Sequence, residues 1–562
     1  MKSFLFFFFF FFFFFFFFFF FFFFFFFVDF SLMVEFYIYT FGVNFFSLIF
    51  FFDWLGLLFI SLVFLISGSV LFYSIGYMWG DLTFVRFFFL VFLFIFSMFM
   101  LILCPNLFCM ILGWDGLGLV SFCLVIFYQN FISLYSGLVT FFFNRLGDVF
   151  LIFGIVFMVN LGSWQYMNYL DLFLIDNLLF YIYFMVFLCS LTSSAQFPFS
   201  CWLPVAMAAP TPVSSLVHSS TLVTSGVYLL IRFNYVLNDY FSYLLFFISL
   251  FTVFISGLSA CVEFDLSKII AFSTLSQLGL MMFSLSLGLV KLSFIHLLIH
   301  ALFKSLLFLC SGFYIFNVGG SQDIRYMGSL MVCFPFISSL FIIGLLSLCG
   351  FPFFCGFYSK DFIIEMVVLM NLGIFKMIFF FFGMGLTVIY SFRLIYYIFF
   401  GSGNYFVLMS FTLNFFMKYS IILLGFLSIF FGSFIFWMIE DLFVFVIDDG
   451  LKNFSLFMFF FFFFFFFFFF FFFFFFFFII FSVYINYFYY FFGSMFFMNF
   501  FFISFFSRIL FGLIKYFFYI EKGWLEYSVF FGLKFILISF LNSFFDSFSY
   551  NYFLMMFLGM FF

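Results

Sequence analysis

The sequence predicts an all-α polytopic membrane protein, and two observations lead to this prediction. Of the 562 residues, 69% are hydrophobic and only 7% are charged, a balance that no soluble packed core requires. Apolar stretches long enough to cross a hydrocarbon layer of about 30 Å recur along the chain, separated by short polar or Gly/Pro breaks. We therefore expect about 15 membrane spans and no extramembrane domain.

Residues 1–72 are expected to form N-terminal transmembrane helices. The run from Phe6 to Phe27 is 22 phenylalanines long, enough for one crossing, and Phe459 to Phe478 is a second homopolymer. A lipid-facing helix needs only apolar bulk, so an AT-rich, organellar genome would account for both runs; a chance low-complexity anchor is the alternative. Lys2 leads directly into a span too long for a signal-peptide core, so we expect a chain that encodes its own membrane address or is made inside the organelle.

Charge and cysteine usage exclude several functions. The formal net charge of -4 arises from scattered residues, so no basic stripe exists for a nucleic acid. The ten cysteines include no C-x-x-C pair, and most lie in apolar stretches, where we interpret them as small hydrophobes rather than ligands. The glycines of GWDGLGLV do not match G-x-G-x-x-G. We expect no cofactor, metal or nucleotide site in this chain.

An internal echo marks two interruptions of apolar spans. Phe197 to Cys201 and Phe351 to Cys355 share the pattern F-P-F-x-C at a separation of 154 residues. Proline breaks a helix and frees backbone carbonyls, and paired broken helices in two halves of a transporter indicate an ion path. Chance similarity in so Phe-rich a chain is the alternative.

The most informative pattern is a file, or straight row, of titratable residues within a stretch that is apolar enough to cross a membrane. His296, His300 and Lys304 are spaced four apart, which on an α-helix places them on one face with a rise of about 6 Å between neighbours. A charge in a bilayer costs about 2.5–3.5 kcal/mol on insertion scales, so the file favours proton relay. The polar groups recur along the chain, which favours a lateral relay over one catalytic pocket; the others are Asp115, Arg145, Asp148, His218, Lys268, Lys360, Asp361 and Glu365.

Several of these residues also have a purely structural interpretation. Arg145 and Asp148 lie three apart near a helix end, where an ion pair or snorkelling is as reasonable as conduction. Lys268 is better interpreted as an anchor near a loop than as a relay member. His218 alone would be a hydrogen-bonded core histidine, and it gains weight only from the two prolines before it and from the other polar groups.

The C-terminal part is expected to comprise transmembrane helices over 401–507, a lateral amphipathic helix over 508–534 and a terminal anchor helix over 535–562. Six charged residues lie among the 27 from Arg508 to Lys534, too many for a cheap crossing. A plain loop is the alternative for 508–534.

Eight ordered stretches between about Tyr73 and Arg393 carry a resemblance to a known family. They are YSIGYMWGDLTFVRFF, LGWDGLGLVSF, NRLGD, SSAQFPFSCWLPVAMAAPTPVSSLVHSSTLVTSGVYLLIRF, DLSKIIAFSTLSQLGLMM, HLLIHALFKSLLFLCSG, SQDIRYMG and GFPFFCGFYSKDFIIE. In these stretches the chain resembles the antiporter-like subunits of proton-pumping NADH:ubiquinone oxidoreductase, complex I. WLEYS sits where such subunits carry a long lateral helix.

The resemblance implies about 16 transmembrane helices and, over 73–400, a proton-translocating core of two inverted repeats joined by a hydrated axis. Asp115 occupies the glutamate position of the family's G-W-E-G motif. His218 corresponds to the histidine after P-T-P-V-S. The H-x3-H-x3-K file is His296, His300 and Lys304, and the F-x-S-K-D pair is Lys360 and Asp361.

One departure from the family pattern concerns the first broken helix. The family reads G-K-S-A-Q there, and Ser193 occupies the lysine position. Between Arg145 and Arg232 there is no lysine or arginine. We therefore expect Asp115 to have lost its cationic partner and the first half-channel to be silent or to work differently, while the second keeps its full set.

The expected function is proton translocation within complex I, as a multi-pass and organelle-encoded subunit of the mitochondrial inner membrane. The resemblance implies that NADH, FMN, iron-sulfur clusters and ubiquinone bind other subunits, and that the partners are other membrane-arm subunits and lipids. One alternative is a subunit of a multisubunit cation/proton antiporter, which shares the motifs. Another is a structural subunit that has lost conduction, tenable for the first half only.

Overall fold

The computed structural model divides into two compact units, Met1–Phe496 and Phe497–Phe562. The second homopolymer, most of the predicted helices over 401–507 and the end of the predicted terminal anchor lie outside the described residues. Those described are 2–41, 44–166, 177–234, 237, 239–370, 373–404, 414–439, 489–543 and 546.

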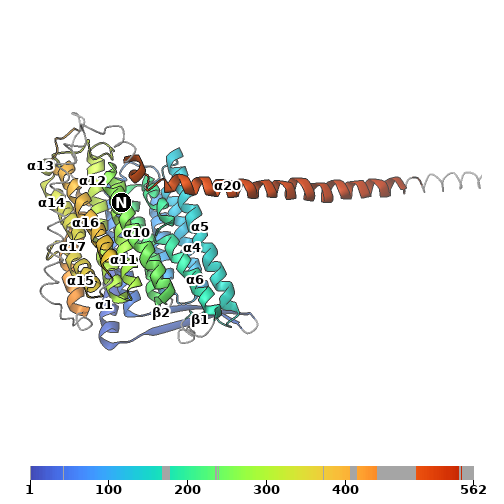
Figure 1. Cartoon of the computed structure of the whole chain (residues 1–562), viewed down its shortest axis with the longest axis horizontal. Helices are drawn as coiled ribbons and strands as arrows, with labels where there is room; N and C mark the ends of the chain where they lie inside the picture. Colours follow the sequence, from blue (N-terminus) through green and yellow to red (C-terminus); the bar gives the residue numbers. More distant parts are fainter. Residues whose placement is uncertain are drawn as a thin grey trace, which may run out of the picture. The chain divides into compact units, whose positions relative to one another are not determined.

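The first unit is a bundle of helices standing side by side (Figure 1). Within the described part of the whole chain, 12 helices are long and apolar enough to cross a membrane, and three shorter apolar helices accompany them, which confirms the polytopic all-α prediction. The helices of this unit with 15 or more residues, which include the shorter α6 and α14, are α1 (Lys2–Val28), α2 (Trp54–Tyr77), α3 (Phe84–Leu103), α4 (Leu107–Val125), α5 (Phe131–Val159), α6 (Asn177–Ser193), α10 (Asp239–Val262), α11 (Leu266–Ser286), α12 (Val290–Asn317), α14 (Pro335–Cys349), α16 (Ile374–Ile395) and α17 (Phe415–Ile439).

The first phenylalanine run is helical, as predicted, and packs one face against α2. Phe11 and Phe22 are almost fully buried, whereas Phe20 on the opposite face is largely exposed. The rings of Phe18 and Phe64 stack with centroids 5.6 Å apart. Other rings on the same side of the homopolymer, such as Phe8 and Phe26, also contact aromatic rings of other elements.

The region 1–72 contains a β-hairpin that the sequence analysis did not predict, so it is not made of helices alone. Strands β1 (Leu32–Phe41) and β2 (Asn44–Phe52) pair antiparallel, with Glu35 opposite Ile49 and a bulge between Tyr37 and Tyr39. Aromatic and β-branched residues suit a pleated strand as well as a membrane helix, and overall hydrophobicity hid the difference. The hairpin crosses one end of the bundle (Figure 1).

Both F-P-F-x-C segments interrupt helices, as predicted. After α6, Ala195 has positive φ and the Phe197–Pro198 bond is cis. After α14, Gly350 adopts φ 87° and ends the helix. The first break leads through η2 (Phe199–Cys201), α7 (Trp202–Val205) and η3 (Ala206–Ala208) to α8 (Thr211–Val213), the π-helical η4 (Ser214–Thr221) and α9 (Leu222–Arg232); the second leads to the π-helical η6 (Phe357–Asp361) and α15 (Phe362–Leu369).

Helix α12 forms the centre of the core. The apolar stretch of α12 that could cross a membrane is completely buried. The helix packs against α2, α11, α14, α17 and η4. Trp54 lies against Phe294 and Tyr77 lies against Phe316, so α2 and α12 run parallel. The remaining short elements of this unit are α13 (Leu330–Cys333) and η7 (Tyr396–Phe400).

The second unit is one long helix over its described residues. It begins with α20 (Met498–Phe518), continues as the π-helical η9 (Tyr519–Gly532) and remains helical to Ser543. Its large apolar residues, including Phe511 and Trp524, are exposed within the unit.

Candidate functional site

The three residues of the predicted file lie together in the middle of α12. His296, His300 and Lys304 are each at most 1% exposed. The two imidazole rings have centroids 6.3 Å apart, matching the spacing expected from the helix. The file is therefore a set of neighbouring, desolvated titratable groups on a completely buried stretch of helix.

His296 connects this file to the second broken helix. Its Nδ1 lies 2.8 Å from Ser359 Oγ, and its Nε2 lies 3.2 Å from Gln277 Oε1. Because the neutral imidazole has one donor and one acceptor nitrogen, Nε2 donating to Gln277 leaves Nδ1 to accept from Ser359. Ser359 immediately precedes Lys360 in η6. One hydroxyl thus joins α12 to the segment that carries the predicted lysine.

The rest of the file is polar but sparsely partnered. Lys304 Nζ donates to Ser273 Oγ on α11. Neither ring nitrogen of His300 has a hydrogen-bond partner within the described part of the chain, and the His300 ring packs edge-on against Phe303. Buried polar groups normally have partners, so ordered water is expected at His300.

Lys360 sits where the broken helix exposes its carbonyls. Its Nζ donates to Leu348 O at 3.2 Å and to Cys349 O at 3.3 Å, the last carbonyls of α14, and to Thr387 Oγ1 at 2.9 Å. The negative end of a helix favours a cation. In the described residues no ion pair joins Lys360 to Asp361, although the two are adjacent in sequence. The break at Gly350 therefore creates the ammonium site.

In the first half, Arg145 of α5 bridges two carboxylates. Its guanidinium lies 3.6 Å from the Asp115 carboxylate on α4 and 2.9 Å from Asp148 one turn along α5. The same guanidinium stacks over the Phe141 ring at 4.9 Å. The expectation that Asp115 has lost its cationic partner is wrong, because the fold brings Arg145 on α5 against Asp115 on α4.

Neither Ser193 nor His218 is hydrogen-bonded to Asp115 in the described structure, so neither takes the place of the missing lysine. Ser193 Oγ donates to Ser190 O at 3.3 Å, and the backbone of Gly226 on α9 packs directly against that hydroxyl. His218 is buried in η4 with its ring 6.2 Å from Trp202, and neither ring nitrogen has a hydrogen-bond partner among the described residues. Among the described residues, the Asp115–Arg145–Asp148 cluster and His218 are therefore separate polar groups of the first half.

Sequence reasoning missed the polar residues that connect the site. Ser273, Gln277, Ser359 and Thr387 contact the predicted relay residues directly. Most serines here only donate to carbonyls of their own helix, for example Ser347 to Gly344 O. A hydroxyl that bridges helices cannot be distinguished from these by its sequence position. Gln277, an amide inside an apolar stretch, is the one signal that could have been noticed.

Lys268 pairs with Asp265 one turn away at the start of α11, with both side chains partly exposed. This agrees with its interpretation as an anchor near a loop. No group of three or more His, Cys, Asp or Glu residues that could hold a metal ion occurs in the described part of the chain.

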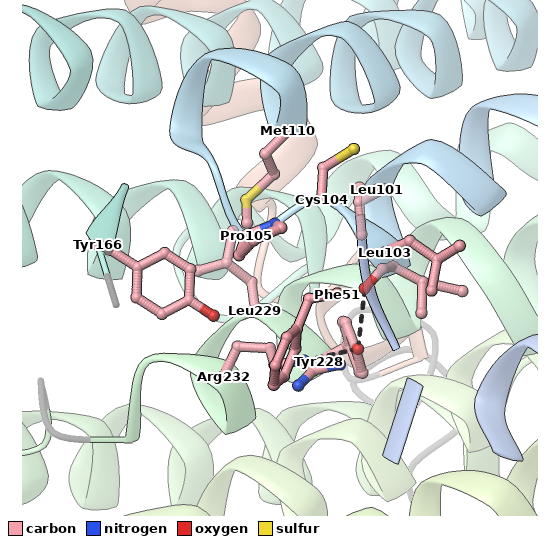
Figure 2. Close-up of a pocket in the computed structure, with 11 residues that line it drawn as sticks. Phe51, Leu101, Leu103, Cys104, Pro105, Met110, Tyr166, Tyr228, Leu229 and Arg232 are labelled. Atoms are coloured by element: carbon pink, nitrogen blue, oxygen red, sulfur yellow. Dashed lines mark hydrogen bonds between the residues drawn. The ribbon is translucent and has the colours of Figure 1, made fainter. Parts of the chain in front are cut away.

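A separate polar contact lies at the hairpin end, beside a small pocket. Asp53 caps α2, and both of its carboxylate oxygens accept from Arg232 at the end of α9. Arg232 Nε donates to the Tyr228 hydroxyl at 2.6 Å, which in turn donates to Ile102 O at 3.1 Å (Figure 2). This network ties the helix that carries η4 to the hairpin end of α2.

Comparisons with known proteins agree with this architecture. Residues 104–387 match the family model described as NADH:quinone oxidoreductase/Mrp antiporter, TM. Residues 40–88 match the model for the N-terminus of chain 5 of NADH-ubiquinone oxidoreductase, complex I.

Proteins named NADH-ubiquinone oxidoreductase chain 5 align over long stretches. The protein of Anopheles quadrimaculatus is 50% identical over 73% of this chain and 72% of its own length. That of Anopheles gambiae is 56% identical over 63% and 61%, and that of Lumbricus terrestris is 42% identical over 76% and 74%.

Two solved structures share the fold. A chain of the Mrp complex from Dietzia sp. aligns with a TM-score of 0.65 at 24% identity, covering 72% of this chain and 45% of that one. A chain of the archaeal membrane-bound sulfane sulfur reductase aligns with a TM-score of 0.63 at 20% identity, covering 70% and 82%. From these matches and the antiporter-like architecture, the chain belongs to the NADH-ubiquinone oxidoreductase chain 5 family of complex I membrane subunits.

Proposed function

We propose that this chain translocates protons across the mitochondrial inner membrane as a complex I subunit, and that the α12 file and the second broken helix form the relay. The observation that carries the proposal is the buried contact of His296 with Ser359, the residue before Lys360. This contact links two groups of titratable residues that are far apart in the sequence, the file on α12 and the Lys360–Asp361 pair on η6.

The proposed relay runs along α12 and crosses to η6. Lys304, His300 and His296 exchange protons through Ser273 and ordered water, and Ser359 passes them toward Lys360. Asp361 is the carboxylate next to Lys360 in sequence. A lysine bound to carbonyls and one hydroxyl, without a carboxylate in contact, can lose its proton when the surrounding field changes.

The first half contributes a different device. The Asp115–Arg145–Asp148 cluster supplies an ion pair that can switch between two carboxylates, and His218 is a separate buried proton acceptor. The cation has been retained on α5, although the broken helix carries Ser193. We therefore propose that both halves are competent but chemically unequal.

Electron transfer belongs to other subunits in this proposal. NADH, FMN, iron-sulfur clusters and ubiquinone would bind elsewhere in the complex, and the partners of this chain would be other membrane-arm subunits and lipids. A multisubunit cation/proton antiporter is the second candidate, because a chain of an Mrp complex shares the fold. Co-purification with NADH dehydrogenase activity supports the first candidate and excludes the second.

The relay is tested by removing one lysine at a time from the intact complex. Lys304→Ala and Lys360→Ala are expected to slow proton uptake by vesicles at matched complex content. Lys291→Ala is the matched control, because Lys291 lies on the same helix α12 but is exposed. Unchanged proton uptake in both relay variants would refute the assignment.

A further inference from the structure

Two buried hydroxyls converge on one glycine of α12. The Thr211 and Tyr73 hydroxyl oxygens lie 2.5 and 2.8 Å from the point where a Cβ of residue 312 would stand. Tyr73 is fully buried and Thr211 is 7% exposed. Any side chain larger than that of Gly312 would push these hydroxyls away. The glycine therefore permits two polar groups to meet against the central helix.

Within the described residues, Tyr73 Oη and Thr211 Oγ1 have no hydrogen-bond partner. The Thr211 hydroxyl faces those of Tyr73 and Tyr77, but it meets hydrogen-bond geometry with neither. Buried hydroxyls without protein partners are typical sites of ordered water, which needs two or more polar neighbours. The three hydroxyls provide that number.

The group continues outward to the end of α2. The rings of Tyr73 and Tyr77 stack with centroids 5.8 Å apart, and Tyr77 is the last residue of α2 and only partly buried. Asp81, four residues further on, is exposed and acts electrostatically on Tyr77. A line of polar groups thus extends from the aqueous end of α2 to Thr211.

The group also continues inward along the first broken helix. Thr211 begins α8, and His218 lies seven residues further along the same broken helix, in η4. Ser214 and Ser215 lie between them, and each donates to a backbone carbonyl. A hydroxyl that donates still has lone pairs with which to accept. His218 at the inner end has two ring nitrogens without a partner among the described residues.

We propose that Tyr73 and Thr211, meeting at Gly312, bind water and form the access point through which protons from the aqueous end of α2 reach His218. The proposal rests on the proposed proton-translocating function. Each transfer breaks one O–H or N–H bond and forms another, so no oxidant or reductant is needed. In this chain the route supplies protons to the first half, although residue 193 is a serine and not a lysine.

The test uses isosteric variants of the intact complex, with proton uptake by vesicles measured per NADH oxidised. Tyr73→Phe and Thr211→Val are expected to lose most of the proton uptake through this route, since a positioned proton-transfer group contributes factors of about 10² to 10⁴. Thr211→Ser, which restores the hydroxyl, is expected to retain uptake. Full uptake in both Tyr73→Phe and Thr211→Val, or equal loss in Thr211→Ser and Thr211→Val, would overturn the proposal.

Tyr314→Phe is the matched control. Tyr314 is a buried tyrosine of α12 whose hydroxyl also lacks a partner in the described chain, but its ring lies against Phe341 and Phe399. It is expected to pump normally, and a loss equal to that of Tyr73→Phe would overturn the access route.

His218→Gln and Lys304→Ala distinguish a failure of the proposed proton-translocating function from a failure of the access route alone. If both pump normally, the proposed function itself fails. If either slows pumping while the Tyr73 and Thr211 variants do not, only the access route fails.

Discussion

At the scale of single residues, the site depends on hydroxyls and amides as much as on its charged groups. His296 is held between Gln277 and Ser359, Lys304 contacts Ser273, and Lys360 contacts Thr387. A hydroxyl can accept a hydrogen bond while it donates another, which a carboxylate without a proton cannot do. Such contacts therefore suit proton transfer.

Replacing Ser359 tests the link between α12 and η6. Ser359→Ala removes the hydroxyl that contacts His296 and leaves Lys360 in place, so we expect slower proton uptake with normal assembly. Ser347→Ala is the control, since that buried serine only donates to Gly344 O of its own helix. Equal rates in Ser359→Ala and the unmodified complex would show that protons do not pass through this hydroxyl.

Replacing Arg145 tests the cation that pairs with Asp115 and Asp148 in the first half. Arg145→Gln leaves Asp115 and Asp148 without their shared partner, and at least one should then take up a proton. We expect lower proton uptake. Arg86→Gln serves for comparison, because Arg86 donates to Phe127 O and stacks on the Phe127 ring. If Arg145→Gln pumps as well as Arg86→Gln, the cluster is structural only.

At the scale of elements, broken and π-helical segments place the functional side chains. The second break ends α14 at Gly350 and exposes the carbonyls that bind Lys360. The first break leads into η4, where His218 lies, and η4 continues into α9. Arg232 at the end of α9 binds Asp53 at the start of α2. The position of the His218 segment is thus fixed at the hairpin end by one ion pair.

The Asp53–Arg232 pair should therefore be worth much more to stability than a surface pair. Its side chains are 12% and 9% exposed, and removing one partner of a buried pair costs about 3–5 kcal/mol. Asp53→Asn is expected to lower the temperature at which the purified complex loses this subunit on native gels.

Asp323→Asn is the matched comparison. The Arg325 side chain of that pair is 57% exposed, and surface pairs contribute about 0–1 kcal/mol. The hydrogen bond from Arg325 lowers the pKa of Asp323. The stability that this pair contributes is therefore fully present above the ordinary carboxyl pKa, and it disappears as the pH falls through the lowered pKa of Asp323. Equal losses in Asp53→Asn and Asp323→Asn would contradict the ranking.

At the scale of the whole molecule, the second unit differs from the bundle in the length and charge of its helix. Its helix runs from Met498 to Ser543, about 70 Å at 1.5 Å per residue, whereas a hydrocarbon layer is about 30 Å thick. Six charged residues lie between Arg508 and Lys534. These properties support the lateral helix predicted for 508–534, which stays a prediction.

The orientation of that helix can be measured by labelling. Arg508→Cys and Lys534→Cys should both react with a membrane-impermeant maleimide added to the same side of the membrane, because a lateral helix keeps its ends in one interface. The complex without either cysteine gives the background. Labelling of the two positions from opposite sides would show that the segment crosses the membrane.

The sequence by itself determined the class of protein and the charged members of the site. Hydrophobic length alone requires membrane helices, because backbone groups in lipid must be satisfied within their own segment. The i, i+4 spacing of His296, His300 and Lys304 fixed their common face, and proline marked both breaks. These are local properties, readable along one helix.

Tertiary structure decided which groups meet. The Arg145 contact with Asp115, the Ser359 bridge to His296 and the meeting of Tyr73 with Thr211 at Gly312 each join residues from different helices. A sequence contains these arginines and serines but does not say which helix faces which. Likewise, the hairpin of β1 and β2 follows from pairing between two segments, and composition alone could not separate it from a membrane helix.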